Sequence, residues 1–251
     1  MKSHKNAMPG TAAVPARPAR RSRPQVKSWR RGSLKQRMAQ QFGFLHAAAA
    51  AVVGEVGYAN ASIALITAKV GVAQGTFYNY FESRQDILDK LLPALGEEML
   101  AHIRQCASGG RNYTEIEERI FRGFFSFLGK TPHFSRILNE AESFAPAGHK
   151  QHFDNVSKKY LRLFHRSKLE GAFPNYREAE LEVVVFILLA ARSYLALRYL
   201  GPAGKKSSLP EWVAKTYMKF VRYGLEGVPP PARAQAPSRA IKTKKKVKAS
   251  A

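Results

Sequence analysis

Hydrogen-bonding side chains gather in one short stretch of the sequence, GVAQGTFYNYFESRQDIL at residues 71–88. Gln and Asn amides can bond bidentately to N6 and N7 of adenine, whereas Thr, Tyr and Arg side chains suit phosphate oxygens. A glycine lets the backbone approach a partner without a Cβ in the way. These residue types favour DNA recognition, and the candidate contacts are Ser62, Gln74, Gly75, Thr76, Tyr78, Asn79, Tyr80 and Arg84.

Two short helices joined by a turn at Gly71 must position these side chains. Ser62 is a good N-cap for the first, which ends at Gly71, and the second is predicted at about residues 73–80. This is helix-turn-helix spacing, in which the second helix enters the major groove. Phe77 and Phe81 are four residues apart and are expected to face the core, while the polar residues face outward.

The helical period continues through the rest of the chain. It predicts a first helix of about 18 residues, broken by Gly54 and Gly57, and a long fourth helix capped by Ser83. No segment alternates with the period of a strand. The expected fold is all-α with about nine helices: an N-terminal three-helix helix-turn-helix domain, then a helical ligand-binding and dimerisation domain.

Positive charge is concentrated at both ends of the sequence. Of the net +23, residues 1–35 contribute ten basic residues and residues 228–251 seven, with no acid in either, leaving +6 for residues 36–227. The expected organisation is therefore a disordered basic arm (1–32), a DNA-binding domain (33–82), an effector-binding and dimerisation domain (83–227) and a disordered basic tail (228–251). A non-specific compaction protein acting through its tails is the alternative.

Other function classes find little support. The single cysteine, Cys106, excludes an internal disulfide and a thiolate zinc site. The apolar run at 183–191 is too short to span a membrane, and the phosphate-loop, dinucleotide and nucleophile-elbow motifs are missing from the sequence. We expect no enzyme activity, catalytic residue, metal, cofactor or membrane partner, and a cytoplasmic, nucleoid-associated location.

Residues 36–88 resemble the DNA-binding domain of tetracycline-repressor-like (TetR) transcriptional regulators. The resemblance rests on AAAAVVGEVGYANASIALITAKVGVAQGTFYNYFESRQDIL, which follows the family pattern nearly position for position from Gly71 to Arg84. It implies a repressor, a double-stranded DNA operator, a small-molecule effector and a homodimer.

Five positions depart from that pattern. The first is Ala61, where the family usually has threonine, so the cap of the second helix falls to Ser62 alone. Ala64 and Leu65 stand where the family commonly has arginine and aspartate, Gln74 replaces a basic residue, and Glu82 replaces a proline. These departures bear on operator sequence and affinity. The basic arm is expected to offset the lost phosphate contact.

The C-terminal helices suit dimerisation. The segment 183–200 is apolar nearly all round, and the last helix carries Trp212, Tyr217 and Phe220. Such helices from two subunits would form a four-helix interface, with core burial inside one subunit as the alternative. A two-fold dimer implies a near-palindromic operator.

Phenylalanines are abundant between residues 113 and 176, where they line a pocket or simply fill the core. We expect an apolar or acyl-type effector here. The candidate effector-binding residues are Phe125, Arg136, Asn139, Phe153 and Tyr160.

Overall fold

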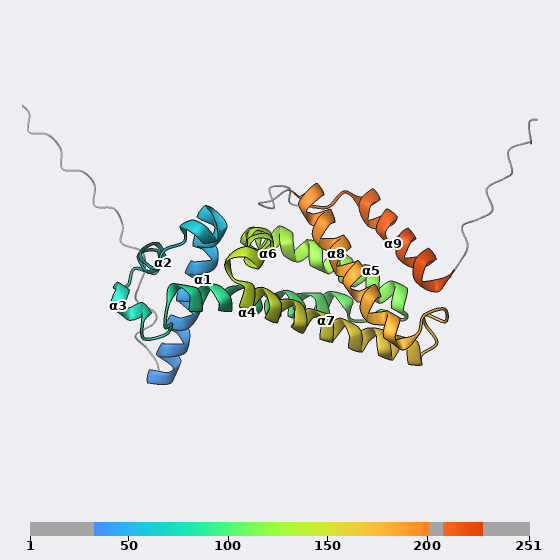
Figure 1. The fold of residues 1–251 in the computed structure, drawn as a ribbon, viewed down its shortest axis with the longest axis horizontal. Coiled ribbons are helices and arrows are strands. Elements are labelled where there is room, and N and C mark those ends of the chain that lie inside the picture. Colours follow the sequence, from blue (N-terminus) through green and yellow to red (C-terminus); the bar gives the residue numbers. More distant parts are fainter. Residues whose placement is uncertain (1–32, 201–207, 228–251) are drawn as a thin grey trace, which may run out of the picture.

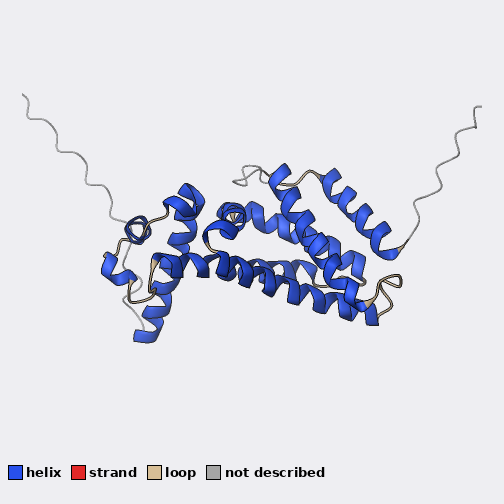
Figure 2. Cartoon of the chain, in the orientation of Figure 1, coloured by secondary structure: helices blue, strands red, loops and turns tan. Residues whose placement is uncertain are grey.

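Helices account for all the regular structure in the computed structural model, which describes residues 33–200 and 208–227 (Figures 1 and 2). The predicted arm at 1–32 and tail at 228–251 lie outside the described residues. Nine α-helices and a 3₁₀ turn follow one another, which confirms the predicted fold class: α1 (Leu34–Asn60), α2 (Ile63–Val70), α3 (Gln74–Phe77), α4 (Arg84–Ala107), α5 (Tyr113–Lys130), α6 (Pro132–Phe144), α7 (Pro146–Leu169), η1 (Glu178–Glu180), α8 (Leu181–Tyr199) and α9 (Glu211–Glu226).

Helix α1 is longer than predicted, with 27 residues instead of about 18. Ser33 and Gln36 form a capping box at its start. The helix passes through Gly54 without a break, so that part of the prediction was wrong. A Cβ at Gly54 would lie 2.1 Å from Nδ1 of His133, so the glycine allows α6 to pack closely on α1. Only Gly57 leaves helical geometry, at φ 82°.

Length and composition alone would let one stretch of α1, Gln36–Asn60, cross a membrane. Half of that stretch is buried inside the fold, where α1 packs on α2, α4 and α6. Its apolar residues are thus those of a core helix.

The short helices α2 and α3 follow local sequence signals. The Ser62 hydroxyl accepts a hydrogen bond from the N–H of Leu65, and Gly71 ends α2 in the left-handed conformation at φ 79°. Helix α3 spans only four residues because the chain turns at Tyr78. Phe77 and Phe81 are buried at 0% and 1% exposure, which confirms their predicted core position.

Helix α4 connects the α1–α3 unit to the larger body formed by α5–α9 (Figure 1). Ser83 caps it as predicted, by accepting from the N–H of Asp86. Along the body α4 packs on α5 and α7. The α7 contact is close, because a Cβ at Gly148 would lie 2.1 Å from the backbone oxygen of Asp89.

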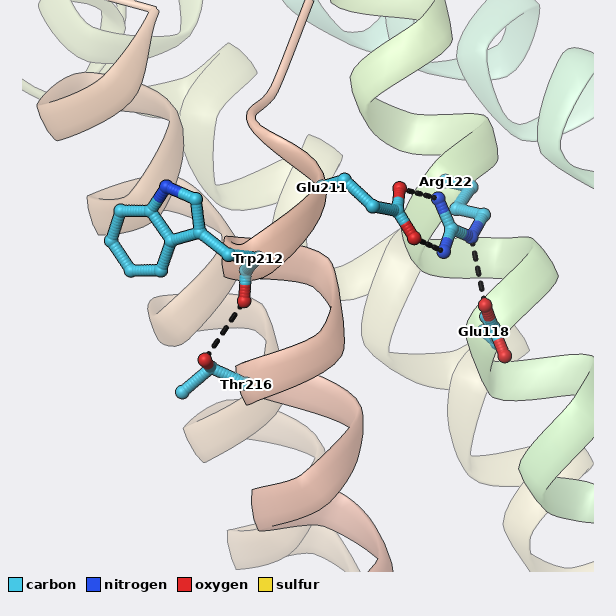
Figure 3. Close-up of polar contacts among 5 residues, drawn as sticks. All are labelled: Glu118, Arg122, Glu211, Trp212 and Thr216. Carbon is cyan, nitrogen blue, oxygen red and sulfur yellow. Dashed lines mark hydrogen bonds and ion pairs between the residues drawn. The ribbon is translucent and has the colours of Figure 1, made fainter.

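Helix α9 packs on α5, where Arg122 of α5 binds both carboxylate oxygens of Glu211 at 2.8 Å (Figure 3). Trp212 points away from α5 in the same view and is 58% exposed. Helix α8 buries one side and leaves several large side chains outside. The large apolar side chains exposed on these two helices are Val183, Phe186, Ile187, Tyr194, Leu197, Trp212 and Phe220.

Candidate nucleic-acid interface and ligand cavity

One face of α3 and the following turn presents polar side chains to solvent. Gln74, Gly75, Tyr78 and Asn79 are exposed and Thr76 is half-buried. Phe77 lies beneath them and packs edge-on against the Tyr78 ring, with ring centroids 5.5 Å apart. The buried phenylalanine therefore fixes the turn that carries the exposed groups.

Gly75 has open space around it. A Cβ at this position would meet no atom within 4 Å, and its φ is not in the left-handed region. Neither packing nor backbone conformation therefore requires glycine here. Because Gly75 has no side chain, no side-chain atom covers the backbone between Gln74 and Thr76, and a large partner can approach it there.

Three other predicted DNA contacts are engaged inside the α1–α4 region. The Tyr80 hydroxyl donates to Oε1 of Gln41 on α1 at 2.9 Å, and the Ser62 hydroxyl caps α2. Arg84 donates to the backbone oxygens of Tyr58, Ala59 and Ala61, where α1 ends. A cation suits the carbonyl end of a helix. The predicted DNA roles of Ser62, Tyr80 and Arg84 stay predictions.

A second cluster joins α1 to α6. Glu140 accepts from the Tyr58 N–H at 2.9 Å and from Nε of Arg136 at 2.8 Å. Arg136 also donates to the backbone oxygens of Gly54 and Glu55. The carboxylate and the guanidinium thus bind the last turns of α1, the helix that leads into α2 and α3.

An apolar-lined cavity of about 570 Å³ lies among α4, α5, α6, α7 and α8. Its apolar wall includes Leu100, Ile103, Ile120, Phe124, Phe153 and Leu189. Exposed Arg104 and Arg162 stand at its edge, beside the ion pair of Lys159 with Glu97. His152, Tyr160 and Arg192 form its buried polar part.

Two of the five predicted effector contacts, Phe153 and Tyr160, line this cavity. The structure does not bring the other three to this cavity. Arg136 is turned toward α1, and Asn139 is exposed on α6. Phe125 is buried against Phe121 and lines a smaller pocket next to α9.

A buried carboxylate next to the cavity was missed by the sequence reasoning. Glu117 of α5 is 0% exposed and accepts from Arg192 of α8, Tyr160 of α7, Tyr217 of α9 and Tyr113 of its own helix. Burial raises the pKa of all three tyrosines, so they remain hydrogen-bond donors. Burial is the largest single influence on the pKa of Arg192 and lowers it, but Glu117, Tyr160 and Tyr217 together outweigh burial, so the arginine pKa is raised.

Sequence signals for this cluster existed. Glu117 falls on the apolar side of α5, between Tyr113 and Ile120, and Arg192 interrupts the apolar run of α8. A charged residue on a buried face calls for a partner of opposite charge. Among the described residues, no three His, Cys, Asp or Glu side chains are grouped to hold a metal ion.

His152 is buried at 4% exposure and fits into α4 at Gly96, where a Cβ would lie 2.2 Å from its Nδ1. Burial lowers its pKa to about 4, and the neighbouring His149 contributes to this shift. The cavity wall therefore carries a neutral imidazole at neutral pH.

Comparisons with known proteins agree with this geometry. Residues 45–91 match the family model described as bacterial regulatory proteins, tetR family. The repressor KstR2 of Mycobacterium tuberculosis is 22% identical over 186 residues, covering 72% of this chain and 91% of KstR2. The structure of KstR2, described as a ketosteroid transcriptional regulator, is similar with a TM-score of 0.51, at 18% identity over 74% of this chain and 95% of that one.

Two further solved structures share the fold. A TetR-family regulator from Syntrophomonas wolfei has a TM-score of 0.62 at 23% identity, covering 74% of this chain and 95% of that one. FadR from Bacillus subtilis, in complex with stearoyl-CoA, has a TM-score of 0.59 at 15% identity, covering 72% of this chain and 97% of that one.

Proposed function

This chain belongs to the TetR family of bacterial regulatory proteins, and from that premise we propose that it is a homodimeric repressor. It binds a near-palindromic operator and is released when a small, largely apolar molecule enters the cavity. The observation that carries the proposal is the continuous helix α4, which begins beside the exposed face of α3 and lines the cavity further along. The family is one of transcriptional regulators, and we assign no catalytic residue.

The proposed DNA surface consists of Gln74, Gly75, Thr76, Tyr78 and Asn79. Their exposure on a helix-turn-helix unit supports direct contact with base edges and phosphates. The same proposal places the boundary between the DNA-binding domain and the effector-binding domain at residues 82 and 83, because Ser83 caps the helix that leads away from the helix-turn-helix unit. A cytoplasmic, nucleoid-associated location is part of the proposal too.

The proposed dimer forms through α8 and α9. Phe186 and Ile187 on α8 and Trp212 and Phe220 on α9 are 46% to 61% exposed in the single chain. Such a collection of large apolar groups usually marks an interface. Pairing two copies through this face places two α3 units on one DNA duplex, which is the reason for a near-palindromic operator.

The proposed effector has an acyl-type or other extended apolar body. An apolar wall supports this class, as do the stearoyl-CoA of FadR and the ketosteroid named for KstR2. Arg104 and Arg162 at the cavity edge add a place for an anionic group outside the buried part, such as the phosphates of a coenzyme A ester.

Purified full-length protein tests the proposal. Selection from random DNA should yield one near-palindromic sequence, bound far more tightly than random DNA, and a metabolite screen should find a compound that releases it. An Ile120→Trp variant, which fills the cavity, should keep operator binding and lose release by the effector. Ile116→Trp enlarges a second lining residue of the cavity and should have the same effect. Equal affinity for all DNA would instead favour the compaction alternative.

A further inference from the structure

The buried part of the cavity holds a cation with unused hydrogen-bonding capacity. Arg192 is 4% exposed and lines the cavity beside Tyr160. Both hydrogen bonds that it donates leave from the same nitrogen, Nη2, to Glu117 and to the Tyr160 hydroxyl. Its Nε is buried and has no partner among the described residues. Buried donors are almost always paired, and Arg192 is a lining residue of the cavity, so a ligand bound there is the nearest candidate to supply the missing acceptor.

The charge of Arg192 is already balanced. Glu117 is completely buried and lies against the guanidinium, and Tyr217 and Tyr160 donate to the same carboxylate. The cluster therefore has no net charge. A ligand carboxylate next to it would add an unbalanced buried charge, which is strongly unfavourable, whereas a neutral oxygen would satisfy the donor without adding charge.

The surroundings of this cluster are apolar. Ile120, Phe124, Val156 and Leu189 line the same cavity and contain no hydrogen-bonding side chain. A ligand at this depth thus gains burial along its body and one directional contact at its end. The geometry around Arg192 is that of a site for a largely apolar molecule with a buried acceptor.

We propose that Arg192 donates a hydrogen bond to an uncharged carbonyl oxygen at the buried end of the effector. Glu117, Tyr160 and Tyr217 are positioning residues that hold the guanidinium in place. This inference rests on the proposed function, in which the cavity receives an effector, and it specifies that ligand as a ketone, ester or thioester. A free acid would place its carboxylate at the cavity edge.

Calorimetric titration of the full-length protein with three compounds that share a ten-carbon main chain tests this assignment. The compounds are 2-decanone, its hydrocarbon analogue 2-methyl-1-decene, and decanoate. The ketone should bind about tenfold to a hundredfold more tightly than the alkene, as expected for a hydrogen bond from a charged donor. Equal affinity of the two would overturn the inference.

Variants separate the hydrogen bond from packing. Glu117→Gln combined with Arg192→Met removes both charges together and leaves neither unpaired, and it should abolish the ketone preference while alkene affinity stays unchanged. Arg192→Lys keeps a charge opposite Glu117 but lacks the Nε–H, and it should reduce the same preference. The matched control is Arg122→Met with Glu211→Gln, which removes the surface ion pair between α5 and α9 (Figure 3). This control should retain the preference for the ketone over the alkene.

The outcomes distinguish this inference from the proposed function. A parallel loss of ketone and alkene affinity in the double variant would mean that Arg192 only supports packing, and the inference fails. If the double variant lost more affinity for decanoate than for the ketone, an anion would occupy the buried end of the cavity, and the inference would fail as well. In both cases operator release by a metabolite still supports the proposed function, which fails only if no compound releases the operator.

Discussion

The buried imidazole of His152 makes the stability of this protein depend on pH in a way that can be worked out from its surroundings. The ring lies against the rings of Phe134 and Phe153 on the cavity wall. Burial lowers its pKa from 6.5 to about 4. Between these two values the unfolded chain binds a proton at this site and the folded chain does not.

The sign of the effect follows from this difference in proton binding. The free energy of unfolding falls as the pH is lowered through the interval, because protons favour the unfolded chain. The contribution of His152 is fully present above pH 6.5 and lost by about pH 4. At about 1.4 kcal/mol per unit of pKa difference, the whole interval is worth about 3 kcal/mol. His46, whose pKa burial also lowers, adds a change of the same sign.

Urea unfolding followed by circular dichroism, at one protein concentration and between pH 5 and pH 7.5, measures the effect. His152→Phe keeps a flat ring and removes the titration, so wild-type stability should fall relative to this variant by about 2 kcal/mol at pH 5. A Phe153→Leu control, which alters the packing beside the ring of His152 and removes no titratable group, should retain a fall in stability toward low pH. Parallel curves for wild type and His152→Phe would refute the reasoning.

Three further predictions concern DNA contact and helix packing. Gln74→Ala should change base preference in a DNA selection more than overall affinity; a uniform loss across sequences would assign Gln74 to phosphate. Removal of residues 1–32, which hold nine basic residues and no acid, should weaken operator binding and reduce its salt dependence in titrations from low to high salt, and unchanged binding would rule out a role for the arm. Gly148→Ala should lower the free energy of unfolding by about 1–3 kcal/mol, because its Cβ would overlap the oxygen of Asp89, whereas Gly43→Ala, which meets no atom within 4 Å, should not.

The DNA-facing helices were predictable because their signals are local. Ser62 and Ser83 each cap a helix through the N–H three residues later, and Gly71 supplies the left-handed residue that ends α2. Phe77 and Phe81 are four residues apart and are buried together. A short segment of sequence contains all of this information.

The cavity was predicted less well because its wall depends on how distant helices pack. Arg136 and Phe153 both lie in the phenylalanine-rich region, yet one faces α1 and the other faces the cavity. The central charged pair joins Glu117 to Arg192, 75 residues apart in sequence. Each residue alone is recognisable as a charge on an apolar face, but their pairing requires the tertiary structure.

Arg84 shows how cavity and DNA surface can be coupled. Its guanidinium binds three backbone oxygens at the end of α1, just before α2 begins, so the orientation of α2 and α3 depends on the first turn of α4. Further along, the same helix lines the cavity with Met99 and Ile103. A ligand alters DNA affinity only if it binds one arrangement of these helices better than another. Arg84 of α4 and Glu140 of α6 each hold the end of α1, so a shift of α4 against α6 would strain the end of α1 between these two contacts. If the proposed effector binds in the cavity, such strain is the route by which it would act on α2 and α3, and the contact that Arg84 makes with the end of α1 would be part of that route.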